Sequence, residues 1–154
     1  MTLHRPSNMS DNVLNNIFSA TNEFSDQYDV ILPAHPRLKI FLEKTQINYQ
    51  NVKLIEPLAY VDFLSLVKGS QLVLTDSGGL QEETTYLGVN CLTLREETER
   101  PITVSEGTNK VIGTAQKIII SEINNSLSTS ISNEVKINYW DGNTSKRIFE
   151  VLFK

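Results

Sequence analysis

The segment 72–84 combines residue types that could bind an anion. An apolar run ends at Asp76, and the small residues Ser77, Gly78 and Gly79 follow directly. A strand that ends in glycines and restarts as a helix leaves several backbone N–H groups unpaired at one point. Together with the helix dipole, these groups form a site for phosphate or another anion. The glycines could equally serve only a tight strand–helix connection, since glycine is the usual residue of strained turns.

Charged side chains follow at two places. Glu82 and Glu83 lie near the predicted helix start, where they either complement the helix dipole or accept hydrogen bonds from a ribose diol. The run from Arg95 to Pro101 comes directly after a predicted buried strand. Charge runs are usually solvated loops, but an arginine at a strand end can donate paired hydrogen bonds to a diphosphate or a carboxylate.

Three further candidates each have a plain structural interpretation. His4 lies near the N-terminus, where a frayed end is the default. His35 precedes a proline and could be a helix-start histidine without a task. Phe63 lies on an apolar helix face, where core packing is the simplest role. The positions of His4 and His35 directly after strands nevertheless keep both histidines among the candidates.

Length and composition narrow the function classes. The chain has 154 residues, enough for one domain with a substantial core. Its net charge of −4 disfavours a general nucleic-acid binder. The single Cys91 allows no internal disulfide, and no Cys/His cluster has metal-ligand spacing, so we expect no metal. The sequence shows neither a signal-peptide core nor a membrane-length apolar run, so we expect a cytoplasmic protein.

Short strands and helices must position these residues. Strands are expected at 28–33, 52–55, 72–75, 91–94 and 110–113. Helices are expected at 11–26, 36–47, 60–70, 80–87, 115–127 and 142–153, the last closing the domain after a polar loop at 128–138. The alternation predicts an α/β fold with a mostly parallel sheet. Ligands of such sheets bind beyond the carboxyl ends of the strands, where the polar candidates lie.

The motifs together resemble one family. Asp76-Ser-Gly-Gly-Leu-Gln-Glu-Glu83, followed by Arg95-Glu-Glu-Thr-Glu-Arg-Pro101, resembles the non-hydrolysing UDP-N-acetylglucosamine 2-epimerases. Thr2-Leu-His-Arg-Pro-Ser-Asn8 is similar to the family's Thr-x-His-Arg-x-Glu-Asn segment. Further matches fall in the family's order at His35-Pro36, Glu56-Pro57-Leu58, Gly107-Thr108, Gly113-Thr114 and Asp141-Gly142. The resemblance covers essentially the whole chain.

The resemblance implies a fold and a domain organisation. The family has two Rossmann-like domains in the GT-B arrangement, and residues 1–154 resemble only the C-terminal, UDP-binding one. Thr2 and Leu3 would be what remains of its central first strand, which would be truncated. We therefore expect a fragment that is inactive alone and binds UDP weakly. A separate chain or segment would supply the N-terminal domain, and the intact enzyme would be a homodimer.

The resemblance also implies roles for the candidate residues. Ser77, Gly78 and Gly79 would bind the UDP phosphates through N–H groups and the serine hydroxyl, and Glu83 would hold the ribose hydroxyls. The other implied roles are uracil contact for Phe63, nucleotide contact or loop bracing for Arg100, catalytic assistance near the diphosphate for His4, and an activator site for a second UDP-sugar at His35.

The chemistry implied by the resemblance needs no metal or nicotinamide. The family eliminates UDP across C1–C2 of the sugar and adds it back after C2 is reprotonated on the other face. Two positions depart from the family pattern, because Ser7 and Ile102 stand where glutamate is usual. The alternatives are a GT-B glycosyltransferase, a hydrolysing epimerase, and a non-catalytic UDP-sugar-binding module or remnant.

Overall fold

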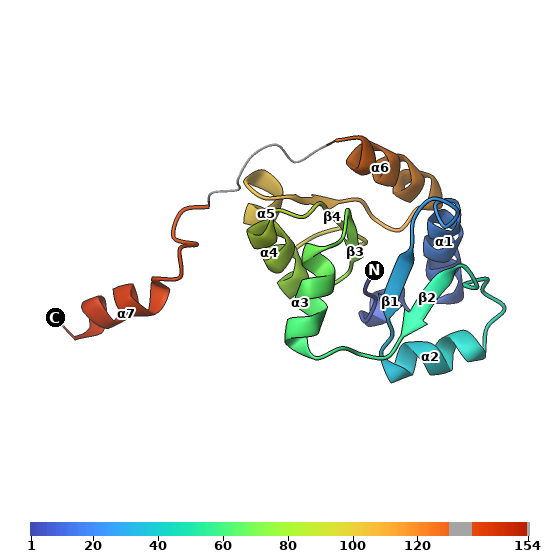
Figure 1. Ribbon diagram of the computed structural model, residues 1–154, viewed down its shortest axis with the longest axis horizontal. Helices are drawn as coiled ribbons and strands as arrows, with labels where there is room; N and C mark the ends of the chain where they lie inside the picture. The colour runs from blue at the N-terminus through green and yellow to red at the C-terminus, as the bar shows by residue number, and fades with distance from the viewer. Residues whose placement is uncertain (130–136, 154) are drawn as a thin grey trace.

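The structure is a computed structural model that describes residues 1–129 and 137–153 (Figure 1). Its strands are β1 (Val30–Pro33), β2 (Val52–Ile55), β3 (Val73–Thr75), β4 (Cys91–Thr93) and β5 (Asn109–Val111). Its α-helices are α1 (Asp11–Asn22), α2 (Pro36–Glu43), α3 (Tyr60–Lys68), α4 (Gly78–Leu87), α5 (Pro101–Ser105), α6 (Gln116–Ser128) and α7 (Thr144–Leu152), and a short 3-10 helix, η1, spans Pro6–Asn8. The strands alternate with helices, which confirms the predicted α/β class.

All strand pairs are parallel. β1 pairs with β2, and β3, β4 and β5 form a second sheet in that order. The first residues of the chain lie between the two sheets, because Met1 donates a hydrogen bond to Ile31 on β1 and Thr2 forms a parallel bridge with Thr75 on β3. The prediction that Thr2 and Leu3 lie in the middle of the sheet is therefore confirmed.

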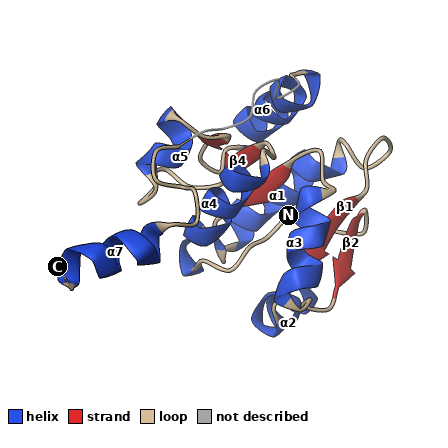
Figure 2. Ribbon diagram, turned by 60° about the vertical axis from the view of Figure 1, so that its left-hand side comes forward, coloured by secondary structure: helices blue, strands red, loops and turns tan. Residues whose placement is uncertain are grey.

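Hydrophobic side chains cover both faces of the sheets. Neighbouring residues of β3 belong to different cores: Leu74 packs in the larger cluster with residues of α1 and α6, whereas Val73 packs in a smaller cluster with residues of α3 and α4. Successive strand side chains point to opposite faces, so the two clusters lie on opposite sides. Figure 2 shows helices on both sides of the strands.

The five predicted strands are confirmed, whereas several helix ends differ. The helix that starts at Asp11 ends at Asn22 rather than at residue 26, and α2 ends at Glu43 rather than at residue 47. Tight turns follow both ends: the N–H of Phe24 donates to Thr21, three residues earlier, and a similar bond follows α2. Such bonds tighten the chain and end the regular α-helix.

Two short helices were not predicted from the sequence. η1 follows His4 and Arg5, and α5 begins at Pro101, the last residue of the charge run. Both begin with a proline, Pro6 and Pro101. Proline suits the first helical turn, because the N–H that it lacks would be unpaired there in any case. These prolines were the available signal.

The C-terminal helix differs most from its prediction. α7 begins at Thr144 rather than at residue 142, and Figures 1 and 2 show it away from the rest of the molecule. The expected apolar face of Ile148, Val151 and Leu152 is exposed, so the expected closing of the domain is not seen. Residues 130–136 of the expected polar loop lie outside the described residues.

Within the described ranges, no helix is both long and apolar enough to span a membrane.

Candidate functional site

The site is built around the start of α4, directly after β3. The helix begins at Gly78, two residues before the predicted start at Leu80. The earlier start has a local cause, because the hydroxyl of Ser77 accepts a hydrogen bond from the N–H of Leu80 and so caps the helix. Gly78 and Gly79 are therefore the first helical residues rather than a separate turn.

The space beside each glycine, rather than its backbone conformation, distinguishes Gly78 from Gly79. Neither Gly78 nor Gly79 has a positive φ. A Cβ added at Gly78 would lie 3.1 Å from Oε1 of Glu99, closer than side chains normally approach. A Cβ added at Gly79 would meet no atom within 4 Å. The space beside Gly79 is thus open to a ligand that approaches the backbone closely.

The donors at this helix start differ in availability. The N–H of Ser77 donates to Oγ1 of Thr75 at 2.9 Å, so it is engaged within the protein. The N–H groups of Gly78 and Gly79 lie in the first turn, where the helix supplies no acceptor. The predicted anion site therefore has two backbone donors and the Ser77 hydroxyl, at the positive end of the helix dipole.

A buried carboxylate holds His4 beside this helix start. Asp76 is fully buried and accepts hydrogen bonds from the backbone N–H groups of His4 and Arg5 at 2.9–3.1 Å. Its Oδ1 also lies 2.7 Å from Nδ1 of His4. The imidazole is 51% exposed, so its other nitrogen remains accessible. Asp76 thus orients His4 at the carboxyl end of the sheet.

Asn8 extends this connection to the next strand. Its amide nitrogen donates to Asp76 at 3.2 Å and to the carbonyl of Leu94 at 3.0 Å. The segment 4–8 is therefore fixed against the ends of both β3 and β4. His4 therefore does not lie on a frayed end, and its catalytic role stays a prediction.

Two arginines to which the sequence analysis gave no individual role lie at the same place. Arg5 and Arg95 each pair with Glu99, at 2.6 Å and 2.5 Å. Hydrogen bonds from the backbone N–H of Glu99 itself, from Arg95 and from Arg5 lower the pKa of this carboxyl to about 2. Because Glu99 approaches Gly78, the start of α4 has two guanidinium groups nearby.

Arg100 lies on the loop that faces α4. Its Nε lies 3.0 Å from Oε2 of Glu82, and its backbone N–H donates to Oγ1 of Thr98. Thr98 in turn donates to the buried side chain of Gln81 at 2.5 Å. In this arrangement Arg100 braces the loop against the helix, which was one of its two predicted roles.

The predicted ribose and uracil residues lie on two facing helices. Glu83 of α4 accepts a hydrogen bond at 3.0 Å from the hydroxyl of Tyr60 of α3, and this bond raises the pKa of Tyr60. Phe63 faces inward and packs against a cluster that includes Val67 and Leu80. The exposed aromatic residue next to Glu83 is thus Tyr60, which sequence periodicity did not distinguish from Phe63.

His35 lies at the carboxyl end of β1, as expected, and precedes α2. Its Nδ1 accepts a hydrogen bond from the N–H of Arg37 at 3.2 Å, so it caps this helix. The structure does not bring His35 into contact with the residues around Gly78. Its role in an activator site stays a prediction.

Within the described residues, no group of His, Cys, Asp and Glu side chains could hold a metal ion.

The motifs and the geometry agree with a comparison against known families. The family model for UDP-N-acetylglucosamine 2-epimerase matches residues 1–153. The chain belongs to this family. Among curated members of the epimerase family, it is 38% identical over 167 residues to the UDP-N-acetylglucosamine 2-epimerase of Methanococcus maripaludis. It is 37% identical over 155 residues to the UDP-2,3-diacetamido-2,3-dideoxy-D-glucuronate 2-epimerase of Pseudomonas aeruginosa. Both comparisons cover 99% of the chain.

Solved epimerase structures have the same fold. The Methanocaldococcus jannaschii UDP-GlcNAc 2-epimerase, in complex with UDP-GlcNAc and UDP, matches 98% of the chain with a TM-score of 0.83 and 35% identity. The Neisseria meningitidis enzyme bound to UDP-GlcNAc matches 98% with a TM-score of 0.78 and 33% identity. In every case named here, the chain spans less than half, 43%, of the relative's length. The predicted resemblance to one domain of a GT-B fold is thus confirmed.

Proposed function

We propose that this chain is the UDP-binding part of a UDP-sugar 2-epimerase. The observation that carries the proposal is the open start of α4 at Gly79, with His4 held beside it by Asp76. Helix starts with open backbone donors are suited to phosphate groups. Relatives that match 99% of the chain are 2-epimerases of UDP-sugars, which supports the nucleotide and the reaction class.

In this proposal the diphosphate binds at the start of α4. The N–H groups of Gly78 and Gly79 and the hydroxyl of Ser77 donate to its oxygens. Arg5 and Arg95 add positive charge nearby, and guanidinium groups suit phosphate oxygens. Their present partner, Glu99, neutralises part of this charge.

The nucleoside lies between α3 and α4. Glu83 accepts hydrogen bonds from the ribose hydroxyls, which requires that the Tyr60 hydroxyl move aside. The ring of Tyr60 then lies at the edge of the nucleoside, and Phe63 supports it from the core. Arg100 keeps the facing loop in place through Glu82.

The reaction is elimination and re-addition of UDP. The C1–O bond breaks as a base removes the proton from C2, which gives the 2-acetamidoglucal and UDP. Negative charge develops on the leaving diphosphate, and the α4 donors and His4 stabilise it there. The proton is then returned to the other face of C2, and UDP adds back. The acid–base groups at C2 come from outside this chain.

The sugar is the least specified part of the substrate. UDP-N-acetylglucosamine is favoured by the family model and by the archaeal relative. The Pseudomonas aeruginosa relative acts on a diacetamido glucuronate with almost the same identity. A second candidate substrate is therefore a UDP-sugar with a carboxylate. Both candidates share UDP and the acetamido group at C2.

The complete enzyme has further expected features. A polypeptide equivalent to the remainder of the relatives supplies the facing domain, the intact enzyme is a homodimer, and it acts in the cytoplasm. These features follow from the family resemblance and are part of the proposal. The chain is expected to bind UDP weakly by itself and to turn over no UDP-sugar.

Ligand-dependent thermal unfolding tests the proposal. A ligand that binds only the folded state raises the melting temperature, and at equal concentration a tighter ligand raises it more. UDP at millimolar concentration should raise the melting temperature. Uridine should raise it only a little, and ADP should raise it less than UDP does. An equal response to all three, or none from a folded chain, would contradict a UDP site. Turnover of UDP-N-acetylglucosamine by the chain alone would contradict the proposal that the acid–base groups at C2 come from outside this chain.

A further inference from the structure

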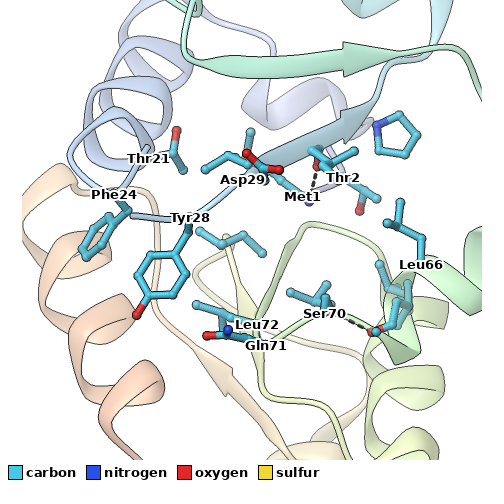
Figure 3. A pocket seen from close by; sticks show the side chains of 18 of the residues that line it. Met1, Thr2, Thr21, Phe24, Tyr28, Asp29, Leu66, Ser70, Gln71 and Leu72 are labelled. Carbon is cyan, nitrogen blue, oxygen red and sulfur yellow. Dashed lines mark hydrogen bonds between the residues drawn. The ribbon is translucent and has the colours of Figure 1, made fainter. Parts of the chain in front are cut away.

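A group of buried polar side chains lies apart from the apolar pocket of the molecule. The pocket, of about 460 Å³ between β1 and β3, is lined mainly by apolar residues such as Phe24, Leu66 and Leu72 (Figure 3). The polar group lies between α4, β4, α5 and β5, and none of its members lines the pocket. This group, the amide cluster, consists of Gln81, Thr93, Thr98, Thr103 and Asn109.

The side-chain oxygen of Gln81 is the central acceptor of the amide cluster. Gln81 has no exposed surface, and its Oε1 accepts hydrogen bonds from Oγ1 of Thr98 at 2.5 Å and from Nδ2 of Asn109 at 3.1 Å. Asn109 is held in turn by Thr93, which donates to its Oδ1 at 2.6 Å. Among the described residues, Nε2 of Gln81 has no partner. Gln81 therefore takes part in the cluster through its acceptor oxygen.

The cluster holds both backbone polar groups of Arg100. The N–H of Arg100 donates at 3.0 Å to Oγ1 of Thr98, whose own hydrogen goes to Gln81. The carbonyl of Arg100 accepts from the hydroxyl of Thr103 at 2.7 Å and from its N–H at 3.0 Å. The same hydroxyl accepts from Asn109 at 3.1 Å. The backbone of Arg100 is thus tied to Gln81 through one threonine and to Asn109 through the other.

The ion pair of Arg100 adds less to the placement of this loop. Nε of Arg100 lies 3.0 Å from Oε2 of Glu82, and both side chains are 41% exposed. Exposed ion pairs contribute little, because water screens the charges and two long side chains must be ordered. A broken hydrogen bond in a buried cluster costs more, since the group left behind also lacks water. The amide cluster therefore fixes the loop more firmly than the surface ion pair does.

The loop held in this way carries charge to the start of α4. Glu99 lies in the loop, and its carboxylate lies beside Gly78. The same carboxylate pairs with Arg5 and with Arg95. Gln81 belongs to the same helix as Gly78 and lies about one turn further along it. The separation between the backbone donors of α4 and the two guanidinium groups is consequently determined through Gln81.

We propose that Gln81 is a positioning residue of the diphosphate site. Gln81 is buried and does not touch the ligand, but it acts through Thr98 to hold the loop 95–100 at the distance that a diphosphate at the helix start requires. A binding site keeps its affinity only while a supporting shell holds the groups that contact the ligand. This inference rests on the proposed function for its ligand, whereas the link from Gln81 to Arg100 is measurable without any ligand.

Amide hydrogen exchange tests the link from Gln81 to Arg100. Gln81→Met has similar length but no acceptor oxygen, so Thr98 loses its partner. The amide of Arg100 should then exchange about fivefold faster or more, as expected for a weakened local hydrogen bond. The amide of Phe24, bonded in a turn outside the cluster, should keep its rate. Nuclear magnetic resonance of the labelled whole chain measures both rates. An unchanged rate at Arg100 would overturn the link.

Thr98 provides a second test that leaves the buried glutamine in place. Thr98→Val removes the hydroxyl with little change in shape, whereas Thr98→Ser retains it. The valine variant should speed exchange at Arg100 as Gln81→Met does, and the serine variant should restore the slow rate. This pair decides the matter if circular dichroism shows that Gln81→Met does not fold. Equal exchange rates at Arg100 in Thr98→Val and Thr98→Ser would overturn the role of this hydrogen bond.

Calorimetric titration of UDP connects the amide cluster to the site. Gln81→Met and Thr98→Val should each bind UDP about fivefold more weakly or more, and Thr98→Ser should bind like the wild type. Thr84→Val is the matched control, because Thr84 is buried on α4 and its hydroxyl donates to carbonyls of its own helix. This variant should keep the UDP affinity even where its melting temperature falls.

The outcomes separate positioning from general stability. Faster exchange at Arg100 together with weaker UDP binding, both absent in Thr84→Val, supports the positioning role. Faster exchange with unchanged UDP affinity would overturn it, and so would an equal loss of affinity in Thr84→Val. A folded wild-type chain that binds no UDP would contradict the proposed function and with it this role in UDP binding. The exchange rates would still show whether Gln81 holds Arg100.

Discussion

The Nδ1 atom of His4 lies 2.7 Å from Oδ1 of Asp76, a carboxylate with no exposed surface. The same carboxylate accepts backbone hydrogen bonds from His4 and Arg5 and an amide hydrogen bond from Asn8. Asp76 therefore has two functions at once. It fixes the segment 4–8 to the end of β3, and it holds the imidazole at the carboxyl end of the sheet.

Asp76→Asn should destabilise the chain more than His4→Ala does. An asparagine presents an N–H group to donors that now meet a carboxylate, and we expect a loss of about 2–3 kcal/mol in the free energy of unfolding. His4→Ala removes only the half-exposed side-chain contact and should cost about 1 kcal/mol or less. Urea denaturation of the two variants measures the difference. Equal losses would show that Asp76 does not hold the backbone segment.

Ionised Glu99 should stabilise the fold near neutral pH and should lose this effect in acid. Its pKa is lowered in the folded state from 4.5 to about 2, so the folded state binds the proton more weakly than the unfolded state. The stabilisation is complete above about pH 4.5 and is lost as the pH falls toward 2. Melting temperatures of the wild type and Glu99→Gln should therefore converge across this interval. A difference that is constant from pH 7 to pH 2 would exclude this contribution from Glu99.

Binding of UDP should release the Tyr60 hydroxyl. The hydrogen bond to Glu83 raises the pKa of Tyr60, so replacement of this bond by ribose hydroxyls should lower the pKa toward its ordinary value. Glu83→Gln should have the same effect without ligand. Ultraviolet titration, with Tyr60→Phe as the reference, follows this one tyrosine. If its pKa is unchanged at saturating UDP, Glu83 does not hold the ribose.

The strands and their parallel arrangement could be predicted because their signals are local. Short apolar runs separated by helical periodicity define parallel β–α–β units whatever the rest of the chain does. Helix ends were less predictable. The end of α1 at Asn22 depends on a turn that buries Phe24 in the core, and packing of this kind has no local signature.

The site residues likewise divide into those with a local sequence signal and those that only the fold brings together. Gly78, Gly79 and Glu83 could be proposed as site residues because a strand end and a helix start are adjacent in the sequence. The pair of Arg5 and Glu99 joins residues that are 94 positions apart, so only the fold reveals it. Tyr60 was missed because it is exposed and carries no periodic signal, while Phe63 on the same helix was selected through the family resemblance.

Calorimetric titration of UDP into wild-type chain and Gly79→Ala tests the central claim most directly. The Cβ of a helical residue points toward the helix start, so this methyl group enters the space assigned to the diphosphate without touching the protein. UDP affinity should fall by about tenfold or more, while the melting temperature stays equal or rises, because alanine stabilises a helix by about 0.5–1 kcal/mol relative to glycine. Tyr86→Ala, an exposed position on the same helix, should bind UDP like the wild type. Unchanged affinity in Gly79→Ala would contradict a diphosphate site at the start of α4.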